Sequence, residues 1–374
     1  MPRRRGRRAG RPDRLRIVLS HVYSWPEVRR GGERYLHEVA SALHDAGHEV
    51  SVLSSAPSAG RGEVLDVPVT WFRRRALLRR RFGDCSEELA FGLMAGAHLS
   101  RRRVDVWHAL GTPDAAAAAL LGSAGRLRSV HTTLGIPSRW YRDSRPDRRV
   151  HDMVVRRVDS YVCLSAAAGE ALRSGWGREP VILPGGVDVR RFTPATRNAR
   201  PTLLYSGTLD DPRKNVRMLI EAAGLLRRKV PDLELWISGP GDMRRLLEGA
   251  ARQAREAVVD VGLGDPEEHA LRYARAWVTV LPSYDEAFGL CLLESLASGT
   301  PIVVLERSGG PAEIVRPGIG FASGPSAAEL AEALEKAIDL AAEPDAVAAC
   351  REEAMRYDWR AEIVPRLERL YRAH

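Results

Sequence analysis

Short runs of apolar residues alternate with amphipathic stretches along the first half of this chain. Residues 15–20 and 48–55 have the length and composition of buried strands, and residues 33–47 carry apolar side chains at helical spacing. A glycine pair, Gly31 and Gly32, ends the loop between the first strand and this helix. The opening residues therefore predict a β-α-β unit, which strand-like runs continue at 104–110, 127–133 and 158–165.

The second half repeats this alternation after a Pro-Gly-Gly break at residues 184–186, which we interpret as a boundary between domains. A strand, a polar turn and a helix follow, and strand-like runs then recur at 233–241, 257–264, 276–283 and 299–306. Buried strands that alternate with helices are typical of parallel, doubly wound sheets. A chain of 374 residues is also too long for one typical core. We therefore expect two α/β domains, at residues 14–183 and 184–355.

The composition, 44% hydrophobic and 28% charged, is typical of a soluble globular protein. No run of about 18 apolar residues predicts a membrane span, and the apolar run after the basic start is broken by His21, so it does not resemble a signal peptide. The four cysteines lie far apart, which argues against a disulfide framework and against a zinc site. These features favour a cytoplasmic location.

The net charge of +9 is concentrated in the first half of the chain. Residues 1–183 carry 32 Lys+Arg against 19 Asp+Glu, whereas the rest carry 25 against 29. Residues 1–13 predict a flexible basic arm, and basic clusters remain at 72–82 and 101–103. These clusters are either solvated faces of an arginine-rich protein or a surface for anionic lipid headgroups or an anionic substrate. Nucleic acid is a less favoured partner, because no recognised binding motif accompanies the charge.

Two strand-to-helix loops have features of a phosphate site. Gly31 and Gly32 allow backbone N–H groups to approach a ligand at the start of a helix, although a glycine pair is also common in ordinary turns. Residues 207–215, GTLDDPRKN, occupy the corresponding loop of the second half. Arg213 and Lys214 in this loop suit a diphosphate, or else belong to a solvated turn.

The stretch EAFGLCLLESLASGTP, residues 286–301, places Glu286 and Glu294 eight positions apart. We expect a loop followed by a helix that begins near Gly289 or Leu290, with Glu294 in its second turn. The free N–H groups of Gly289, Leu290 and Cys291 could then bind phosphate or sugar oxygens. The two carboxylates could accept hydrogen bonds from hydroxyl groups, or they could be a capping residue and a surface residue.

Residues 282–303, PSYDEAFGLCLLESLASGTPIV, strongly resemble the Glu-x7-Glu signature of the family-4 retaining glycosyltransferases. The resemblance extends along most of the chain, in order, through Gly31-Gly32, His131, 186–192, 207–215, 309–315 and 357–359. One departure is Thr208, where many members of the family have arginine directly after the glycine.

This resemblance implies the GT-B fold, in which two Rossmann-like domains face a cleft. The first domain would bind the acceptor, the second would bind a nucleoside-diphosphate sugar, and residues 356–374 would form a helix that crosses back to the first domain. Lys214 and Arg213 would bind the diphosphate, Glu286 the donor sugar and Glu294 the ribose, with His131 near the transferred sugar. The residues expected around the donor are Gly31, Gly32, Gly207, Arg213, Lys214, Glu286, Phe288, Gly289, Leu290, Cys291 and Glu294.

The expected reaction is transfer of a sugar to an acceptor hydroxyl with retention at the anomeric carbon. The chain has no Asp-x-Asp, so cations and N–H dipoles are expected to stabilise the departing diphosphate without a metal, and no other cofactor is expected. The resemblance also implies front-side attack, in which the leaving phosphate helps to deprotonate the acceptor, so no protein nucleophile is required and we assign none. Rival interpretations are a GT-B-fold sugar-nucleotide epimerase, a phosphorylase and a noncatalytic nucleotide-binding protein.

The acceptor is left open at this point, as a glycan, a lipid-linked molecule or a small molecule. The basic first domain could contact an anionic membrane, which would place the protein on the inner face of that membrane.

Overall fold

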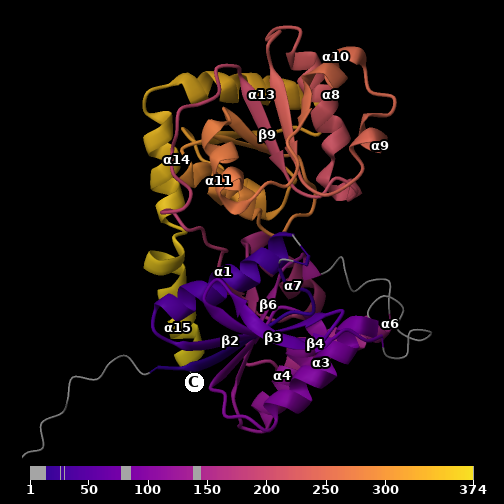
Figure 1. The fold of residues 1–374 in the computed structure, drawn as a ribbon, viewed down its shortest axis with the longest axis vertical. Helices are drawn as coiled ribbons and strands as arrows, with labels where there is room; N and C mark the ends of the chain where they lie inside the picture. Colours follow the sequence, from indigo (N-terminus) through magenta and orange to yellow (C-terminus); the bar gives the residue numbers. More distant parts are fainter. Residues whose placement is uncertain (1–13, 26, 29, 77–85, 138–144, 374) are drawn as a thin grey trace, which may run out of the picture.

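The computed structural model describes residues 14–25, 27–28, 30–76, 86–137 and 145–373 as two α/β domains stacked end to end (Figure 1). The expected basic arm, residues 1–13, and much of the 72–82 cluster lie outside the described residues. In the described part of the first domain, eight strands form one sheet in the order β3-β4-β2-β1-β5-β6-β7-β8. They are β1 (Arg16–Ser20), β2 (Glu49–Ala56), β3 (Gly60–Val64), β4 (Val67–Arg73), β5 (Val106–Ala109), β6 (Arg128–Thr133), β7 (Ser160–Cys163) and β8 (Val181–Ile182).

Helices cover this sheet between its strands. They are α1 (Gly31–Asp45), α3 (Ser86–Leu99), α4 (Thr112–Ser123), α6 (Arg145–Arg157) and α7 (Ala166–Trp176). The strands pair in parallel except for β3 and β4, which form an antiparallel hairpin. The prediction that Gly31 and Gly32 end a loop is wrong, because both residues belong to the first turn of α1.

The second sheet is parallel throughout and has the order β11-β10-β9-β12-β13-β14. Its strands are β9 (Thr202–Ser206), β10 (Glu234–Ser238), β11 (Val258–Asp260), β12 (Val278–Leu281), β13 (Ile302–Leu305) and β14 (Gly320–Ser323). The helical elements are η2 (Pro212–Lys214), α8 (Val216–Leu226), α9 (Met243–Leu247), α10 (Arg252–Ala257), α11 (Pro266–Arg275), α12 (Leu290–Ala297), η3 (Gly310–Glu313), α13 (Ala327–Ala342) and α14 (Ala346–Met355).

Both sheets have the topology that creates a ligand site. In the first, β1 lies between β2 and β5, and in the second β9 lies between β10 and β12, so that the strand order changes direction at β1 and at β9. Ligands of open α/β sheets bind beyond the carboxyl ends of the strands at such a point. Ser20 ends β1 and Ser206 ends β9, so the loops that follow these residues are the expected walls of a site.

The end of the chain returns to the first domain (Figure 1). A single π-helical turn, η4 (Trp359–Ile363), leads into α15 (Val364–Arg372). Trp359 is buried and donates from Nε1 to Glu38 of α1 at 3.2 Å, and the Tyr371 hydroxyl lies 2.7 Å from Nδ1 of His108 in β5. One apolar cluster joins residues of α1, α12 and α15, so the two domains share a continuous core beside the cleft.

Candidate active site

A cleft of about 1140 Å³ is lined by residues from the carboxyl ends of strands in both sheets. Eleven of the twelve residues that the sequence places in the site line this cleft. They are Gly31, Gly32, His131, Gly207, Arg213, Lys214, Glu286, Phe288, Gly289, Leu290 and Cys291. Glu294 is not on the wall. The structure therefore brings residues from four segments of the two domains, at 31–32, 131, 207–214 and 286–291, to one cavity.

Lys214 and Glu286 form an ion pair on the second-domain side of the cleft. Nζ of Lys214 lies 2.5 Å from Oε2 of Glu286, and each side chain is about one-fifth exposed. Lys214 ends the 3-10 turn η2, and Glu286 lies in the loop after β12. The backbone of Glu286 is fixed by two hydrogen bonds, from its N–H to Ser308 O at 2.8 Å and from the Gly310 N–H to its own carbonyl at 3.0 Å.

Arg213 already has a partner within its own loop. Its guanidinium donates to both carboxylate oxygens of Asp211, at 3.1 and 2.5 Å, and Asp211 also caps the turn by accepting from the Arg213 N–H at 2.9 Å. Lys214 pairs with Glu286 from another loop, and the Arg213 carbonyl accepts from the Tyr284 N–H at 2.9 Å. A ligand phosphate would have to compete with Asp211 for Arg213.

The first turns of two helices line the cleft. Helix α12 begins at Leu290, as the sequence predicted, and Gly289 is its N-cap with a left-handed φ of 94°. A Cβ at Gly289 would lie 2.8 Å from Leu281, so both backbone conformation and packing favour glycine there. The other helix is α1, where Gly31 has open space around it. The first turn of a helix has no internal acceptors for its N–H groups and suits an anion.

Two glycines bring the loops after β9 and β10 together. A Cβ at Gly239 would lie 1.7 Å from the carbonyl oxygen of Gly207, and the Gly207 N–H donates to Ser238 O at 2.9 Å. Gly207 and Gly239 both line the cleft. Only glycine at position 239 permits this backbone contact. The sequence analysis did not predict Gly239 as a site residue, although the Ser-Gly-Pro-Gly run at the end of a predicted strand could have indicated it.

His131, at the carboxyl end of β6, is fully buried from bulk solvent yet lines the cleft. Its Nδ1 lies 3.0 Å from the carbonyl oxygen of Ala109. Burial lowers the pKa of this imidazole to about 4, so the ring is neutral at physiological pH. Since the carbonyl can only accept, Nδ1 carries the proton and Nε2, which has no partner, presents a lone pair.

Glu294 lies behind the wall of the cleft, 2% exposed, in the second turn of α12. Arg34 of α1 donates from Nη2 to its Oε1, and His269 Nε2 lies 3.3 Å from its Oε2. Arg34 Nη1 in turn lies 2.8 Å from His269 Nε2. Burial is the main cause that lowers the pKa of His269 to about 3, with Arg34 and other arginines adding to it. Arg34 and His269, not Glu294, therefore face the cavity.

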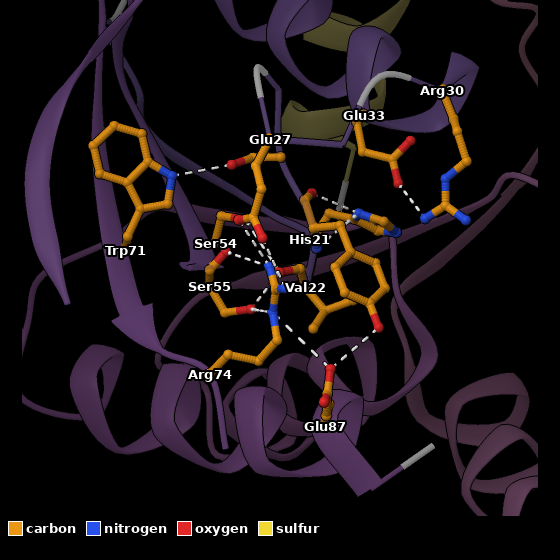
Figure 2. A network of polar contacts seen from close by, with 12 residues as sticks. His21, Val22, Glu27, Arg30, Glu33, Ser54, Ser55, Trp71, Arg74 and Glu87 are labelled. Atoms are coloured by element: carbon orange, nitrogen blue, oxygen red, sulfur yellow. Dashed lines mark hydrogen bonds and ion pairs between the residues drawn. The ribbon is translucent and has the colours of Figure 1, made fainter. Parts of the chain in front are cut away.

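A second polar network joins Tyr23, Arg30 and Glu33 on the first-domain wall to Arg74 and Glu27 behind it (Figure 2). Arg74 donates to both carboxylate oxygens of Glu27 at 2.9 Å, and its guanidinium lies 5.0 Å from the centre of the Tyr23 ring. Arg30 lies 5.6 Å from the same ring and pairs with Glu33 at 2.8 Å. The network fixes the loop that follows β1.

Asp114, in the first turn of α4, is a buried carboxyl group on the cleft wall that the sequence analysis did not single out. Ser20 donates to it, and Trp107 Nε1 donates to Ser20 Oγ at 2.8 Å. Burial raises the pKa of Asp114 to about 8, so this group is protonated at neutral pH. Its neutrality removes a negative charge from the wall.

Comparison with known proteins places both halves of the chain in recognised families. The pattern of "Glycosyl transferases group 1" matches residues 188–355, and that of "Glycosyltransferase Family 4" matches residues 29–191. Glycogen synthase of Mycobacterium tuberculosis is 31% identical over 91% of each chain. Phosphatidyl-myo-inositol mannosyltransferase of Mycolicibacterium smegmatis is 28% identical over 77% of this chain and 75% of its own length.

The fold also resembles that of solved structures. Sucrose-phosphate synthase of Thermosynechococcus elongatus superposes with a TM-score of 0.79, covering 96% of this chain and 98% of its own at 21% identity. Within the described residues, no helix is both long and apolar enough to cross a membrane.

Proposed function

Starting from the fact that this chain belongs to the glycosyl transferases group 1, glycosyltransferase family 4, and has the GT-B fold, we propose that it is a retaining, metal-independent hexosyltransferase. Glycosyltransferase activity with a nucleotide-sugar donor follows from the family. The stereochemistry, the independence of metal and the roles of individual residues are the proposal. The observation that carries it is the Lys214–Glu286 pair beside the N-terminus of α12.

Lys214 stabilises the departing diphosphate in this proposal. Cleavage of the donor leaves new negative charge on the phosphate, and preorganised cations and N–H dipoles lower the energy of that charge most in a site that excludes water. Lys214 supplies the cation, and the free N–H groups of α12 and α1 supply the dipoles. Arg213 contributes once a phosphate replaces Asp211 as its partner.

Glu286 and His131 orient the donor sugar. Glu286 exchanges its contact with Lys214 for a sugar hydroxyl, because an ionised carboxylate only accepts hydrogen bonds. The unprotonated Nε2 of His131 accepts from another hydroxyl. Glu294 binds the ribose, and this role requires Arg34 to release the carboxylate.

The transfer itself needs no nucleophile from the protein. The bond between the anomeric carbon and the phosphate oxygen breaks, and the acceptor oxygen bonds to the same face of that carbon. The acceptor proton passes to an oxygen of the leaving phosphate. The protein's part is to hold the acceptor oxygen on the same face of the anomeric carbon as the leaving phosphate and to stabilise the phosphate charge.

The experiment that tests this function incubates the protein with a panel of nucleoside-diphosphate sugars and candidate acceptors. We expect one donor to release nucleotide and to form an α- or β-glycoside with the anomeric configuration of the donor, observed by NMR, with equal rates in the presence and absence of EDTA. An inverted product would contradict retention, and loss of activity in EDTA would contradict metal independence. A new sugar isomer from donor alone would indicate an epimerase instead.

Peripheral contact with an anionic membrane is a separate part of the proposal. Arg101, Arg102 and Arg103 are exposed after α3, whereas Arg74 of the 72–82 cluster is engaged with Glu27. If the exposed arginines bind lipid headgroups, binding to anionic vesicles should fall steeply with salt. No binding at low salt would remove the membrane from the proposal.

A further inference from the structure

Two side chains of α1 carry buried polar atoms that have no partner and lie on the cleft. Glu33 and His37 are each 2% exposed. Oε2 of Glu33 and both ring nitrogens of His37 lack hydrogen bonds, and both residues line the cavity. They are one helical turn apart, at positions i and i+4, and so share one face of α1. A buried polar atom without a hydrogen-bond partner destabilises the folded chain, so the arrangement indicates a site for a ligand.

The charges on this wall are already balanced by the chain. Among the described residues, Arg30, the N-cap of α1, and Arg34, within α1, line the cleft. Arg30 pairs with Glu33, and Arg34 pairs with Glu294. Arg74, behind the wall, is paired with Glu27 (Figure 2). Arg191, on the segment between the domains, also lines the cleft, and its guanidinium donates to the Pro266 carbonyl at 3.2 Å. The guanidinium groups of Arg30 and Arg34 are therefore already engaged with carboxylates of the chain.

We propose that Glu33 and His37 bind the acceptor, and that this acceptor is an uncharged polyhydroxylated molecule, such as a sugar or a polyol. This inference rests on the proposed function, because it concerns the second substrate of the same cleft. One acceptor hydroxyl donates to Oε2 of Glu33. A neighbouring hydroxyl pairs with His37, whose neutral ring offers one donor and one acceptor.

The state of the two side chains supports this choice of substrate class. Burial lowers the pKa of His37 to about 4, so its ring carries no charge that would attract a phosphate. Glu33 keeps one oxygen free of Arg30, and that oxygen would repel a phosphate or carboxylate on the acceptor. Hydroxyl groups satisfy both residues without adding charge to a buried site.

The test compares matched acceptors with the intact protein and the donor found in the panel. The pairs are maltotriose with its phosphorylated counterpart, and myo-inositol with myo-inositol 1-phosphate. We expect the uncharged member of at least one pair to be preferred by tenfold or more in kcat/KM. The proposal is overturned by preference for the phosphorylated members, by equal use of both, or by use of neither while donor is bound and slowly hydrolysed.

A substitution of Glu33 tests whether the preference for an uncharged acceptor depends on this residue. Glu33→Gln should raise the KM for the uncharged acceptor by about tenfold, a larger change than in the affinity for nucleotide measured on the same variant. Glu27→Gln is the matched control, because it removes a neighbouring carboxylate–arginine pair whose oxygens both have partners, and its KM should match the wild type. An unchanged KM in Glu33→Gln overturns the proposal. Absence of nucleotide binding and hydrolysis with every donor is a different result, and it identifies a failure of the proposed function itself.

Discussion

Arg34 of α1, in the first domain, donates a hydrogen bond to Glu294 of α12, in the second domain. Its guanidinium therefore covers the carboxylate that the family resemblance assigns to the nucleotide ribose. The two residues are 260 positions apart in the sequence. Arg34 lines the cleft and Glu294 does not. If Glu294 binds the ribose as proposed, its contact with Arg34 must first open, which would couple donor binding to the contact between the domains.

Arg34→Ala removes this competitor for the Glu294 carboxylate. We expect the affinity for a free nucleoside diphosphate to rise by roughly threefold to tenfold, equivalent to about 1 kcal/mol, measured by titration calorimetry with UDP, ADP and GDP. Arg360→Ala is the control, because Arg360 joins Asp45 to Asp188 at 2.6 and 2.9 Å without covering Glu294. Weaker binding in Arg34→Ala would show that Arg34 holds Glu294 in position or contacts the nucleotide itself.

Lys214→Ala should lower kcat by about 100-fold or more, because it removes a preorganised cation from the departing diphosphate. The measurement is the steady-state rate with saturating donor and acceptor. Lys229→Ala is the matched control, since Lys229 also forms a lysine–glutamate pair, at 2.6 Å to Glu335, on an exposed surface. Turnover within a few-fold of wild type in Lys214→Ala would remove this residue from the mechanism.

Most strands of the two sheets could be predicted, because each is a short apolar run that is visible in the local sequence. The strand at 276–283 contains VTVL, every residue of which is buried in β12, and the strand at 299–306 contains the equally buried IVVL of β13. The hairpin of β3 and β4 was missed, because β3 is mostly exposed and has no apolar alternation. Its turn, Leu65-Asp66, has positive φ at both residues, a conformation that Asn-Gly or Asp-Gly signals far more clearly.

A residue of the candidate site could be predicted where its own loop carries a recognisable motif. It could not be predicted where its place in the site depends on the packing of two segments that are distant in the sequence. Lys214 and Glu286 follow from recognisable motifs, and both line the cleft. Arg34 and His269 have no local pattern that marks them, since an arginine or a histidine on a helix is usually solvated. Their role depends on how α1 and α11 approach α12, which only the packing of the two domains determines.

Buried neutral histidines predict loss of stability in mild acid. Burial is the main cause that lowers the pKa of His108 to about 3 and of His131 to about 4, below the ordinary value of about 6.5. The unfolded chain therefore takes up protons first as the pH falls from about 6.5 toward 4, and stability falls over that window. Each such histidine removes up to about 1.4 kcal/mol per pH unit.

The measurement is the midpoint of thermal unfolding between pH 7 and pH 5. His108→Gln should be less stable than wild type at pH 7 but should lose less stability on acidification, because one buried titrating group is gone. His44→Gln replaces an exposed histidine near the end of α1 and should follow the wild-type profile. A profile for His108→Gln that is parallel to wild type would contradict this account of the acid sensitivity.

Gly310→Ala tests whether the backbone around Glu286 must be held in place for catalysis. A Cβ at Gly310 would lie 2.1 Å from the carbonyl oxygen of Ala287, and the Gly310 N–H donates to the Glu286 carbonyl at 3.0 Å. The added methyl group must displace the loop that carries Glu286 into the cleft. A shift of about 1 Å at a reacting group costs on the order of 100-fold in rate, so kcat should fall by about that factor.

The matched control for this loop is Gly175→Ala in α7, where an added Cβ would meet nothing within 4 Å. Alanine is the better helix former by about 1 kcal/mol, so this variant should unfold at a slightly higher temperature and keep the wild-type rate. The two variants add the same methyl group and differ only in what it contacts. A wild-type kcat in a folded Gly310→Ala protein would mean that the loop can move away from Ala287 without disturbing Glu286.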